Sequence, residues 1–531
     1  MKANRAFLII LLLAVNIMAT SLVVTADITT DTIWDTDTVL INKEYFEVKE
    51  NARLTIAPGT HVVFLKDISI ITVKGTISAI GALNDSIYIT RKNPTDSWQG
   101  IRLVSRNRSP FNPDTSFFEY CSLRNAFYFP TDVLYQRQGG ILYSGAGNYV
   151  SVRNCTIADV QGDIGGAVFC DSGSTVKVKN SCFTRNKTER NGAVSGGGAI
   201  MTCDSGIVSL SVENCRFDYN SSRNGGAVRI GNGTSAEFNN CIFYRDSTYK
   251  INPGANELCG GALAIFGKNT VITLRNCLMY FCSSYLKGGA IYSYGAILKV
   301  INCTIVQNSS TYGGGCSLNG NSFSISPTFI NTIIDGNGTV GNLPRDSAGC
   351  GVYLDSLAAP VFKNCHMNDT VYNYKVQPLK GELVNSKYCL TDFAWAMNPK
   401  ISDTTPDGYQ LYKYDSAIDA GTADTSGLGL PEFDLAGNKR INGTTIDIGA
   451  FEYYKGASTL PYTLNRKSLP MFTSGEMAVY TFRGQKLKVF KSNSSFETVQ
   501  EFVRNKYPSG IYLVTLSSSG KLLWSKNILV K

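Results

Sequence analysis

A pair of glycines followed by a short apolar segment recurs six times along the middle of this chain. Successive pairs are separated by 32, 28, 35, 28 and 25 residues. The pairs begin at Gly165, Gly197, Gly225, Gly260, Gly288 and Gly313. A repeat of this length predicts a solenoid, in which each unit buries its apolar face against the next unit.

A second periodic mark is a set of eight cysteines, most of which follow an asparagine. They are Cys121, Cys155, Cys182, Cys215, Cys241, Cys277, Cys303 and Cys365. In one unit Thr332 takes this place, after Asn331. The distance from a glycine pair to the next cysteine is 15 to 18 residues, whereas the distance from the cysteine to the next pair varies from 10 to 19. Insertions therefore gather on one arc of each turn, which in a solenoid maps to loops on one face.

The remaining pattern predicts an all-β fold. Short segments such as 176–179 and 209–212 alternate apolar and polar residues, and turn signals separate them. No stretch between residues 27 and 452 shows an amphipathic helical pattern. Units of this size with about three short strands and no helix are typical of a parallel β-helix.

Stacking explains the repeated residue types. Equivalent residues of successive coils lie about 4.8 Å apart, so the eight cysteines are expected to form one internal structural row. Four asparagines that follow the cysteines or Thr332, namely Asn186, Asn220, Asn308 and Asn337, are expected to bond one another through their amides. With fifteen cysteines in one chain, disulfide bonds remain an alternative to free thiols. The odd count and the expected row favour thiols.

The two ends of the chain differ from the repeat. Lys2 and Arg5 precede an apolar run over 6–15, and Val24-Thr25-Ala26 follows, which predicts a secretory signal with a cut after Ala26. No later segment is apolar enough to span a bilayer as a helix. Residues 456–531 carry four alternating strand patterns between turn signals and predict a small antiparallel β-sandwich.

These features divide the chain into four parts. Residues 1–26 are the signal peptide, 27–114 an N-terminal cap with the first coils, 115–455 the repeat region with a closing segment, and 456–531 a separate C-terminal domain. The last part resembles the C-terminal sorting domain of type IX secretion cargo, through Gly510–Val514, Gly520-Lys521 and the terminal strand 526–531. The resemblance implies passage across the outer membrane of a diderm bacterium, by contact with the type IX machinery.

The repeat region resembles polymorphic outer-membrane-protein β-helices, which repeat Gly-Gly-Ala-aliphatic and Phe-x-x-Asn. The second motif occurs here at 183–186 and 217–220. The stretches 57–60, 98–101 and 447–452 resemble the first coils and the closing segment of secreted right-handed β-helix proteins. Together these resemblances imply a right-handed, pectin-lyase-like β-helix that is secreted or attached to the outer surface.

An enzyme must be weighed, because right-handed β-helices include lyases and hydrolases that cleave polysaccharides. The chain has no adjacent Asp pair, no Asp-His and no Cys-x-x-Cys, and it has two histidines. Asp171, Asp204 and Asp355 recur at turns, where Asp commonly caps the local backbone. We therefore predict no catalytic residue, no metal site and no cofactor, with calcium as an option if the protein is a lyase.

A binding surface has better support. The variable arc holds tyrosines and arginines, whose rings and charges suit sugars, acidic glycans or protein partners. The candidates are Tyr219, Tyr244, Tyr249, Tyr280, Tyr285, Tyr312, Arg223 and Arg245. The alternative is that these tyrosines only stack along an outer sheet.

The net charge is +9 and falls to +7 without Lys2 and Arg5. With no basic run or recognition helix, this charge does not indicate nucleic acid. The sequence thus predicts a non-catalytic adhesin or carbohydrate-binding protein, whose partner is a polysaccharide or a host or cell-surface ligand. The alternative is a lyase or hydrolase acting on acidic plant or algal polysaccharide, and a third option is a structural surface filament without a ligand.

Overall fold

The computed structural model describes residues 20–66, 68–93, 96–104, 114–127, 138–188, 195–249, 258–320, 324–339, 349–355, 357–367, 371–373, 411 and 417–453. It also describes the strands at 476–481, 486–490, 510–518 and 521–530. Within these ranges all regular structure is β-strand, and no helix could cross a bilayer. The chain forms two compact units, Met1–Leu464 and Asn465–Lys531.

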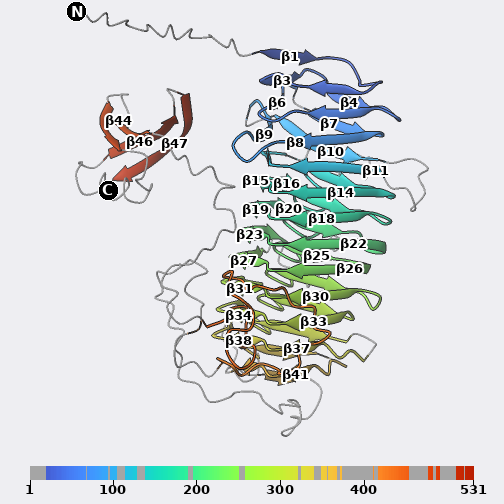
Figure 1. The fold of residues 1–531 in the computed structure, drawn as a ribbon, viewed down its shortest axis with the longest axis vertical. Coiled ribbons are helices and arrows are strands. Elements are labelled where there is room, and N and C mark those ends of the chain that lie inside the picture. The colour runs from blue at the N-terminus through green and yellow to red at the C-terminus, as the bar shows by residue number, and fades with distance from the viewer. Residues whose placement is uncertain are drawn as a thin grey trace, which may run out of the picture. The chain divides into compact units, whose positions relative to one another are not determined.

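Three long parallel sheets wind around one core in the first unit (Figure 1). The first sheet contains β1 (Ser21–Val24), β3 (Thr38–Ile41), β6 (His61–Phe64), β9 (Ile87–Arg91), β12 (Cys121–Arg124), β15 (Thr156–Ala158), β19 (Cys182–Thr184), β23 (Arg216–Asp218), β27 (Ile242–Tyr244), β31 (Leu278–Tyr280), β34 (Thr304–Val306), β38 (Ile333–Asp335) and β42 (His366–Met367). The second contains β4 (Tyr45–Val48), β7 (Ile68–Val73), β10 (Ser97–Leu103), β13 (Leu142–Ser144), β17 (Val168–Cys170), β21 (Ile200–Thr202), β25 (Val228–Ile230), β29 (Leu263–Phe266), β32 (Ile291–Tyr294), β36 (Cys316–Asn319), β40 (Val352–Leu354) and β43 (Val371–Asn373). The third contains β2 (Thr32–Trp34), β5 (Arg53–Ile56), β8 (Thr76–Ile80), β11 (Asp114–Glu119), β14 (Asn148–Arg153), β18 (Thr175–Lys179), β22 (Ser205–Glu213), β26 (Asn232–Asn239), β30 (Val271–Arg275), β33 (Ile297–Ile301), β37 (Thr328–Ile330) and β41 (Val361–Lys363).

Short strands form a fourth, narrow sheet between the first and second sheets along the chain. They are β16 (Gln161–Gly162), β20 (Lys187–Thr188), β24 (Ser221–Ser222) and β28 (Ser247–Thr248), with a further pair β35 (Ser309–Ser310) and β39 (Gly338–Thr339). Each strand of the repeat pairs in parallel with its equivalent one coil away, so the predicted parallel β-helix is confirmed.

The glycine pairs have two separate physical roles, which Gly225 and Gly226 illustrate. Gly225 has a left-handed backbone, with φ of 65°, which side chains disfavour. A Cβ on Gly226 would lie 2.1 Å from the carbonyl oxygen of Gly261 in the next coil. The pair is therefore needed for a bend and for close approach of neighbouring coils.

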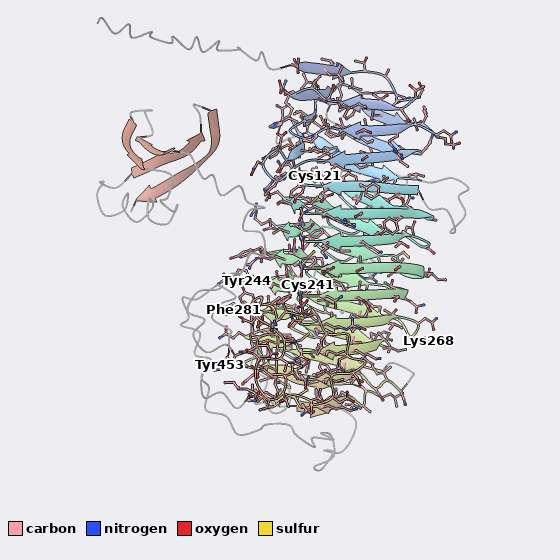
Figure 2. The ribbon with its side chains drawn as sticks, in the orientation of Figure 1. Cys121, Cys241, Tyr244, Lys268, Phe281 and Tyr453 are labelled. Carbon is pink, nitrogen blue, oxygen red and sulfur yellow. The ribbon has the colours of Figure 1, made fainter. Side chains whose placement is uncertain are left out.

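The corner before the first sheet holds the asparagines and the cysteine row. Asn180 and Asn214 have φ values of 50° and 51°, and the amide of Asn214 donates to Oδ1 of Asn180 at 3.1 Å. The next residue is buried and donates to the carbonyl two positions earlier, as Cys215 does to Glu213 at 3.2 Å. Seven of the eight cysteines occupy this inward position, and Cys121 and Cys241 are labelled in Figure 2.

Cys182 does not belong to the expected inward row, so the prediction is wrong for this one cysteine. In the register of β19 it lies opposite Thr156 and Arg216, so it belongs to the outward face of the first sheet. Ser181 occupies the inward position instead, and its hydroxyl donates to the carbonyl of Lys179 at 2.9 Å. Asn180 supplies the left-handed turn, and the residue directly after it faces the core. Cys, Ser and Thr all fit there because each is small and can donate to the same carbonyl.

The four predicted amides occupy a further inward row. Asn186 donates to Asn220 at 3.0 Å, and Asn308 donates to Asn337 at 3.0 Å. The prediction that these asparagines bond one another is confirmed.

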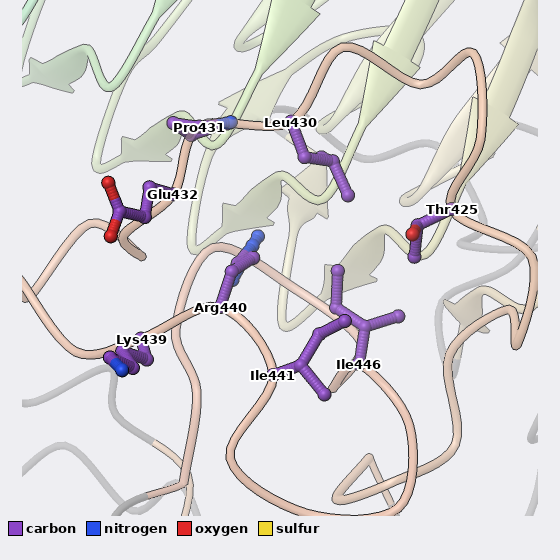
Figure 3. A pocket seen from close by; sticks show the side chains of 8 residues that line it. All are labelled: Thr425, Leu430, Pro431, Glu432, Lys439, Arg440, Ile441 and Ile446. Carbon is purple, nitrogen blue, oxygen red and sulfur yellow. The ribbon is translucent and has the colours of Figure 1, made fainter.

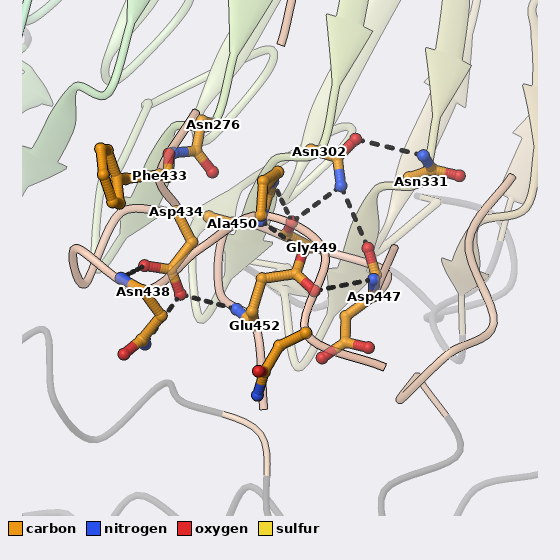
Figure 4. A network of polar contacts seen from close by, with 12 residues as sticks. Asn276, Asn302, Asn331, Phe433, Asp434, Asn438, Asp447, Gly449, Ala450 and Glu452 are labelled. Carbon is orange, nitrogen blue, oxygen red and sulfur yellow. Dashed lines mark hydrogen bonds and ion pairs between the residues drawn. The ribbon is translucent and has the colours of Figure 1, made fainter. Parts of the chain in front are cut away.

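Residues 417–453 form a closing segment that packs on the outer face of the first sheet over β27–β38. Figure 4 shows its polar contacts with the asparagine corner. Its Leu435, Ala450 and Phe451 belong to a second apolar cluster with Tyr244 and Tyr280. Its backbone also caps the asparagine corner. Asn302, for example, donates to the carbonyls of Asp447 and Gly449 at 3.0 and 3.3 Å.

The described residues of the second unit form one antiparallel sheet. Its order is β45 (Lys486–Phe490), β44 (Glu476–Thr481), β46 (Gly510–Ser518) and β47 (Lys521–Val530). These strands overlap the four segments expected from the sequence, although the last begins at Lys521 and not at 526. The described residues form a single sheet, so the expected sandwich stays a prediction.

Candidate functional site

A second corner follows the first sheet in each coil, and its residue has a left-handed backbone. These residues are Asn125, Asp159, Arg185, Tyr219, Arg245, Phe281 and Gln307, with φ between 52° and 60°. This conformation costs about 1–2 kcal/mol for a residue with a side chain. The coil imposes it, because neighbouring coils fix the backbone on both sides. Arg185, Tyr219 and Arg245 are exposed at this corner.

Aromatic rings and an arginine meet at this corner, on consecutive coils. We call Tyr219, Tyr244, Arg245, Tyr280 and Phe281 the tyrosine–arginine cluster. The ring of Tyr219 meets that of Tyr244 edge-on at 5.3 Å, and Tyr244 stacks on Tyr280 at 4.6 Å. The guanidinium of Arg245 lies 5.9, 5.3 and 5.6 Å from the rings of Tyr219, Tyr244 and Phe281. Cation–π attraction of this kind contributes about 0.5–1 kcal/mol at an exposed site.

The cluster has an exposed and a buried layer. Tyr219 is 47% exposed and Arg245 is also exposed, whereas Tyr244 and Tyr280 are 4% and 0% exposed. Figure 2 shows Tyr244 and Phe281 at the same edge of the β-helix. The buried rings therefore hold the exposed pair in place.

An ion pair lies next to the cluster on β23. Nε of Arg216 donates to Oδ2 of Asp218 at 2.5 Å, and the Arg216 guanidinium lies 5.7 Å from the Tyr244 ring. Oδ1 of Asp218 is buried without a hydrogen-bond partner. Burial raises the pKa of the Asp218 carboxyl, although the Arg216 charge opposes this. Burial and the Asp218 charge raise the pKa of the neighbouring Cys182 thiol to about 12, so this thiol is a poor nucleophile.

Further charges continue the corner towards the N-terminus. The guanidinium of Arg185 binds the Asp159 carboxylate through two bonds of 2.6 and 2.9 Å. Arg124 lies 3.4 Å from the same carboxylate. The corner therefore carries one carboxylate paired with two guanidinium groups, on the coils that precede the tyrosine–arginine cluster.

The structure separates the eight predicted ligand-binding residues into two groups. Tyr219, Tyr244, Arg245 and Tyr280 lie in the cluster. The predicted ligand contacts of Tyr244 and Tyr280 are wrong, because both rings are buried beneath the closing segment and cannot reach a ligand.

The other four residues follow the narrow fourth sheet, one corner further along each coil. Arg223 follows β24, and the Tyr249 hydroxyl donates to the carbonyl of Thr188. Tyr285 is 49% exposed, and the Tyr312 ring is 5.0 Å from that of Tyr353. These residues lie on the predicted variable arc, after the fourth sheet and not at the corner that carries the cluster.

Sequence reasoning missed Arg216, Asp218 and Phe281. The signal for the first two is present, since Arg216-Phe217-Asp218 alternates polar and apolar residues and places both charges on the outer face of β23. Phe281 stands one coil after Arg245 at the left-handed position. Its role could be found only once the coils were aligned.

Each of the three recurrent aspartates, which follow strands of the second sheet, is bound by another side chain. The Tyr143 hydroxyl donates to Asp171 at 2.5 Å, Arg229 binds Asp204, and Lys287 binds Asp355 at 2.7 Å. Among the described residues, no three His, Cys, Asp or Glu side chains are grouped to hold a metal ion.

A pocket of about 350 Å³ lies within the closing segment (Figure 3). Arg440, Glu432 and Ile446 are among its lining residues. The Arg440 guanidinium is bound to Glu452 at 2.9 Å and to the Gly449 carbonyl at 3.0 Å. Arg440 therefore holds the segment together, and the tyrosine–arginine cluster is the better candidate site.

Comparison with known proteins gives three findings. The model of the right-handed beta helix region family matches residues 78–252 and 197–377. Over 167 residues, 31% of this chain, the sequence is 26% identical to metabotropic glutamate receptor-like protein R of Dictyostelium discoideum, and the match spans 9% of that protein. The crystal structure of pectate lyase Pel9A superposes with a TM-score of 0.26 and 12% identity, over 75% of this chain and 88% of that chain. Neither of the last two says what this chain binds.

Proposed function

Since this chain belongs to the family of right-handed β-helix proteins, we propose that it is a non-catalytic surface protein. It binds a polysaccharide or another cell-surface ligand through the tyrosine–arginine cluster. The observation that carries this proposal is the exposed Tyr219 ring, fixed edge-on against buried Tyr244 with Arg245 over both rings. An aromatic face beside a cation suits the apolar face of a sugar and its acidic or polar substituents.

The rigidity of the cluster supports a binding role. Buried Tyr244 packs against the exposed Tyr219 ring and itself stacks on buried Tyr280, and neighbouring coils fix the backbone at Tyr219 and Arg245. A preorganised surface loses little conformational entropy when a ligand binds. Because Tyr219 and Arg245 stand on consecutive coils, a ligand that contacts both would lie along the axis of the β-helix.

Binding of the purified first unit to an array of polysaccharides and host cell surfaces tests this function. Tyr219→Ala and Arg245→Ala should each weaken binding about tenfold or more, since hot-spot residues contribute about 2 kcal/mol. Tyr285→Ala is the matched control, because Tyr285 is 49% exposed but follows the fourth sheet. Absence of any binding, together with clear polysaccharide cleavage, would reject the proposal.

Export is the second part of the proposal. The signal-like N-terminus and the resemblance of residues 456–531 to type IX sorting domains support a protein that is secreted or attached to the outer surface of a diderm bacterium. Deletion of residues 456–531 should leave the β-helix folded but trapped in the periplasm. Arrival of the truncated chain at the surface would reject the sorting role.

A polysaccharide-cleaving enzyme is the second candidate, and Asp218 favours it. A carboxyl whose pKa is raised by burial can donate a proton to a leaving group, and Arg216 could neutralise an acidic sugar beside it. Incubation with pectin and alginate, assayed for unsaturated or reducing ends, tests this candidate. Asp218→Asn should abolish such activity and leave ligand binding at Tyr219 intact.

A further inference from the structure

The first rung of the β-helix begins inside the segment expected to be removed. β1 pairs with β3 in parallel over four residues, from Ser21 opposite Thr38 to Val24 opposite Ile41. The bond from the Asn42 amide to the Val24 carbonyl, at 2.9 Å, extends this pairing. The Val24 side chain packs against the main apolar core. Residues 21–24 are therefore part of the folded solenoid.

Thr20 is fixed to the second rung by reciprocal bonds with Asp37. The Thr20 backbone nitrogen donates to Oδ2 of Asp37 at 2.7 Å, and the Asp37 nitrogen donates to Oγ1 of Thr20 at 3.4 Å. The Thr38 amide also donates to the Thr20 carbonyl at 3.1 Å. A positive charge on the Thr20 nitrogen would thus face a carboxylate at hydrogen-bond distance.

We propose that a signal peptidase cuts between Ala19 and Thr20, and that the new terminal ammonium of Thr20 binds the Asp37 carboxylate. Hydrolysis breaks the amide bond, leaves a carboxylate on Ala19 and gives Thr20 an amine, which takes up a proton at neutral pH. This inference rests on the export part of the proposed function. It places the first residue of the mature chain at the start of β1.

A cut after Ala26 would remove this rung. It would take Val24 off the core and expose the unpaired edge of β3. The new ammonium would then stand at Asp27, whose carboxylate already binds Lys43 at 2.5 Å and Lys49 at 3.4 Å. A third cation would be placed beside two others.

The local motifs do not separate the two sites. Ile17-Met18-Ala19 and Val24-Thr25-Ala26 both end in the small residue that signal peptidases require before the cut. Ala19 lies four residues after Val15, the end of the apolar run, whereas Ala26 lies eleven residues after it. The folded rung decides in favour of the earlier site.

The full chain, exported by a diderm host and recovered outside the cytoplasm, provides the test. Mass spectrometry of its N-terminal peptide should show Thr20 as the first residue. A chain that starts at Asp27 would overturn this inference and leave export standing. A chain that retains Met1 would overturn both the inference and the export proposal.

Two matched variants locate the cut independently. Ala19→Leu should reduce processing at least tenfold, because a large residue before the cut blocks the peptidase. Ala26→Leu, at an exposed position, should leave the Thr20 terminus unchanged. The reverse pattern would overturn the inference.

The ion pair has its own readout. Asp37→Asn should raise severalfold the rate at which an amine reagent labels the Thr20 terminus near pH 7, because the carboxylate keeps the amine protonated. Asp35→Asn, also exposed and two residues away, is the control and should leave the rate unchanged. Equal rates in all three proteins would overturn the role of Asp37.

Discussion

Asn220 donates its side-chain amide to Oδ1 of Asp246 at 2.9 Å, inside the β-helix. The same row of amides runs from Asn186 through Asn220, and Asp246 takes the next place in it. Oδ2 of Asp246 is buried without a hydrogen-bond partner. Burial raises the pKa of this carboxyl well above its ordinary value, partly opposed by the bonds from Asn220.

Replacement of this carboxyl by an amide should stabilise the protein. In neighbouring coils the amide at this position also donates to a strand carbonyl, as Asn220 does to Phe183 at 3.0 Å. By the repeat, Asp246→Asn should donate to the Phe217 carbonyl. We expect a gain of about 1–3 kcal/mol at pH 7, the usual cost of an unsatisfied buried polar group. Urea unfolding followed by circular dichroism measures this gain.

The pH dependence of this gain has a definite sign. The folded state holds the Asp246 proton more tightly than the unfolded state, whose pKa is near 3.8. Stability from this group is therefore fully present below pH 4 and is lost as the pH rises towards the folded pKa. The advantage of Asp246→Asn should grow over the same range. Asn308→Asp, at the equivalent place in a later coil, should show the opposite effect.

Some features of this fold could be predicted from sequence because they are local. The glycine pairs and the asparagine before each cysteine mark backbone conformations that few other residues adopt, so their spacing gives the coil. Matching the cysteines, and not the asparagines, of successive coils places Cys182 on the wrong face of its strand. Asn180 makes Ser181, and not Cys182, the inward residue.

The buried part of the candidate site could not be predicted in this way. Tyr244 and Tyr280 stand on outward positions of β27 and β31, where an aromatic residue is normally exposed. Their cover comes from Leu435 and Phe451, more than 150 residues later in the chain. No pattern near the tyrosines signals this contact.

Asn214 should be sensitive to substitution for two separable reasons. Its side chain bonds to Asn180 and Asn240 at 3.1 and 3.0 Å, and its φ is 51°. Asn214→Ala loses both bonds and keeps the strained backbone, so a loss of about 2–3 kcal/mol is expected. Asn214→Gly loses the same bonds without strain and should be about 1 kcal/mol more stable than the alanine variant. If urea unfolding gave the two variants the same free energy of unfolding, backbone strain at position 214 would be contradicted.

The closing segment should be more stable against local unfolding at acidic pH than at neutral pH. Burial raises the pKa of Glu452 to about 8, although Arg440 is 2.9 Å away, and burial raises that of Asp447 to about 6. Both folded values exceed the unfolded values of 4.5 and 3.8. Stability is thus fully present below about pH 4 and falls as the pH rises to about 8.

Hydrogen exchange of amides in 417–453, corrected for intrinsic rates, measures this change. Glu452→Gln should leave only the part of the pH dependence between about 4 and 6, since a neutral amide oxygen can still accept from Arg440. Asp424→Asn, at an exposed turn, is the control and should behave as the original protein. Protection that increases between pH 6 and 8 would contradict the role of Glu452.

Thiol chemistry should report the two faces of the coil. All fourteen cysteines in the described part of the chain are free, so denatured, unreduced protein should show at least fourteen reactive thiols of the fifteen present. Burial raises the pKa of Cys215 and Cys182 to about 12 and that of Cys203 to about 11. At pH 8 roughly one thiol in a thousand or fewer is then a thiolate, so labelling of native protein should be slow. Cys182, which is only partly buried, and Cys203 should be labelled first, and replacing both by alanine should remove this fastest phase of labelling.

The variant Cys215→Ser should keep the fastest phase of labelling, because Ser181 shows that a hydroxyl fits the inward row. Rapid loss of Cys215 thiol in the native protein would mean that the row is open to solvent.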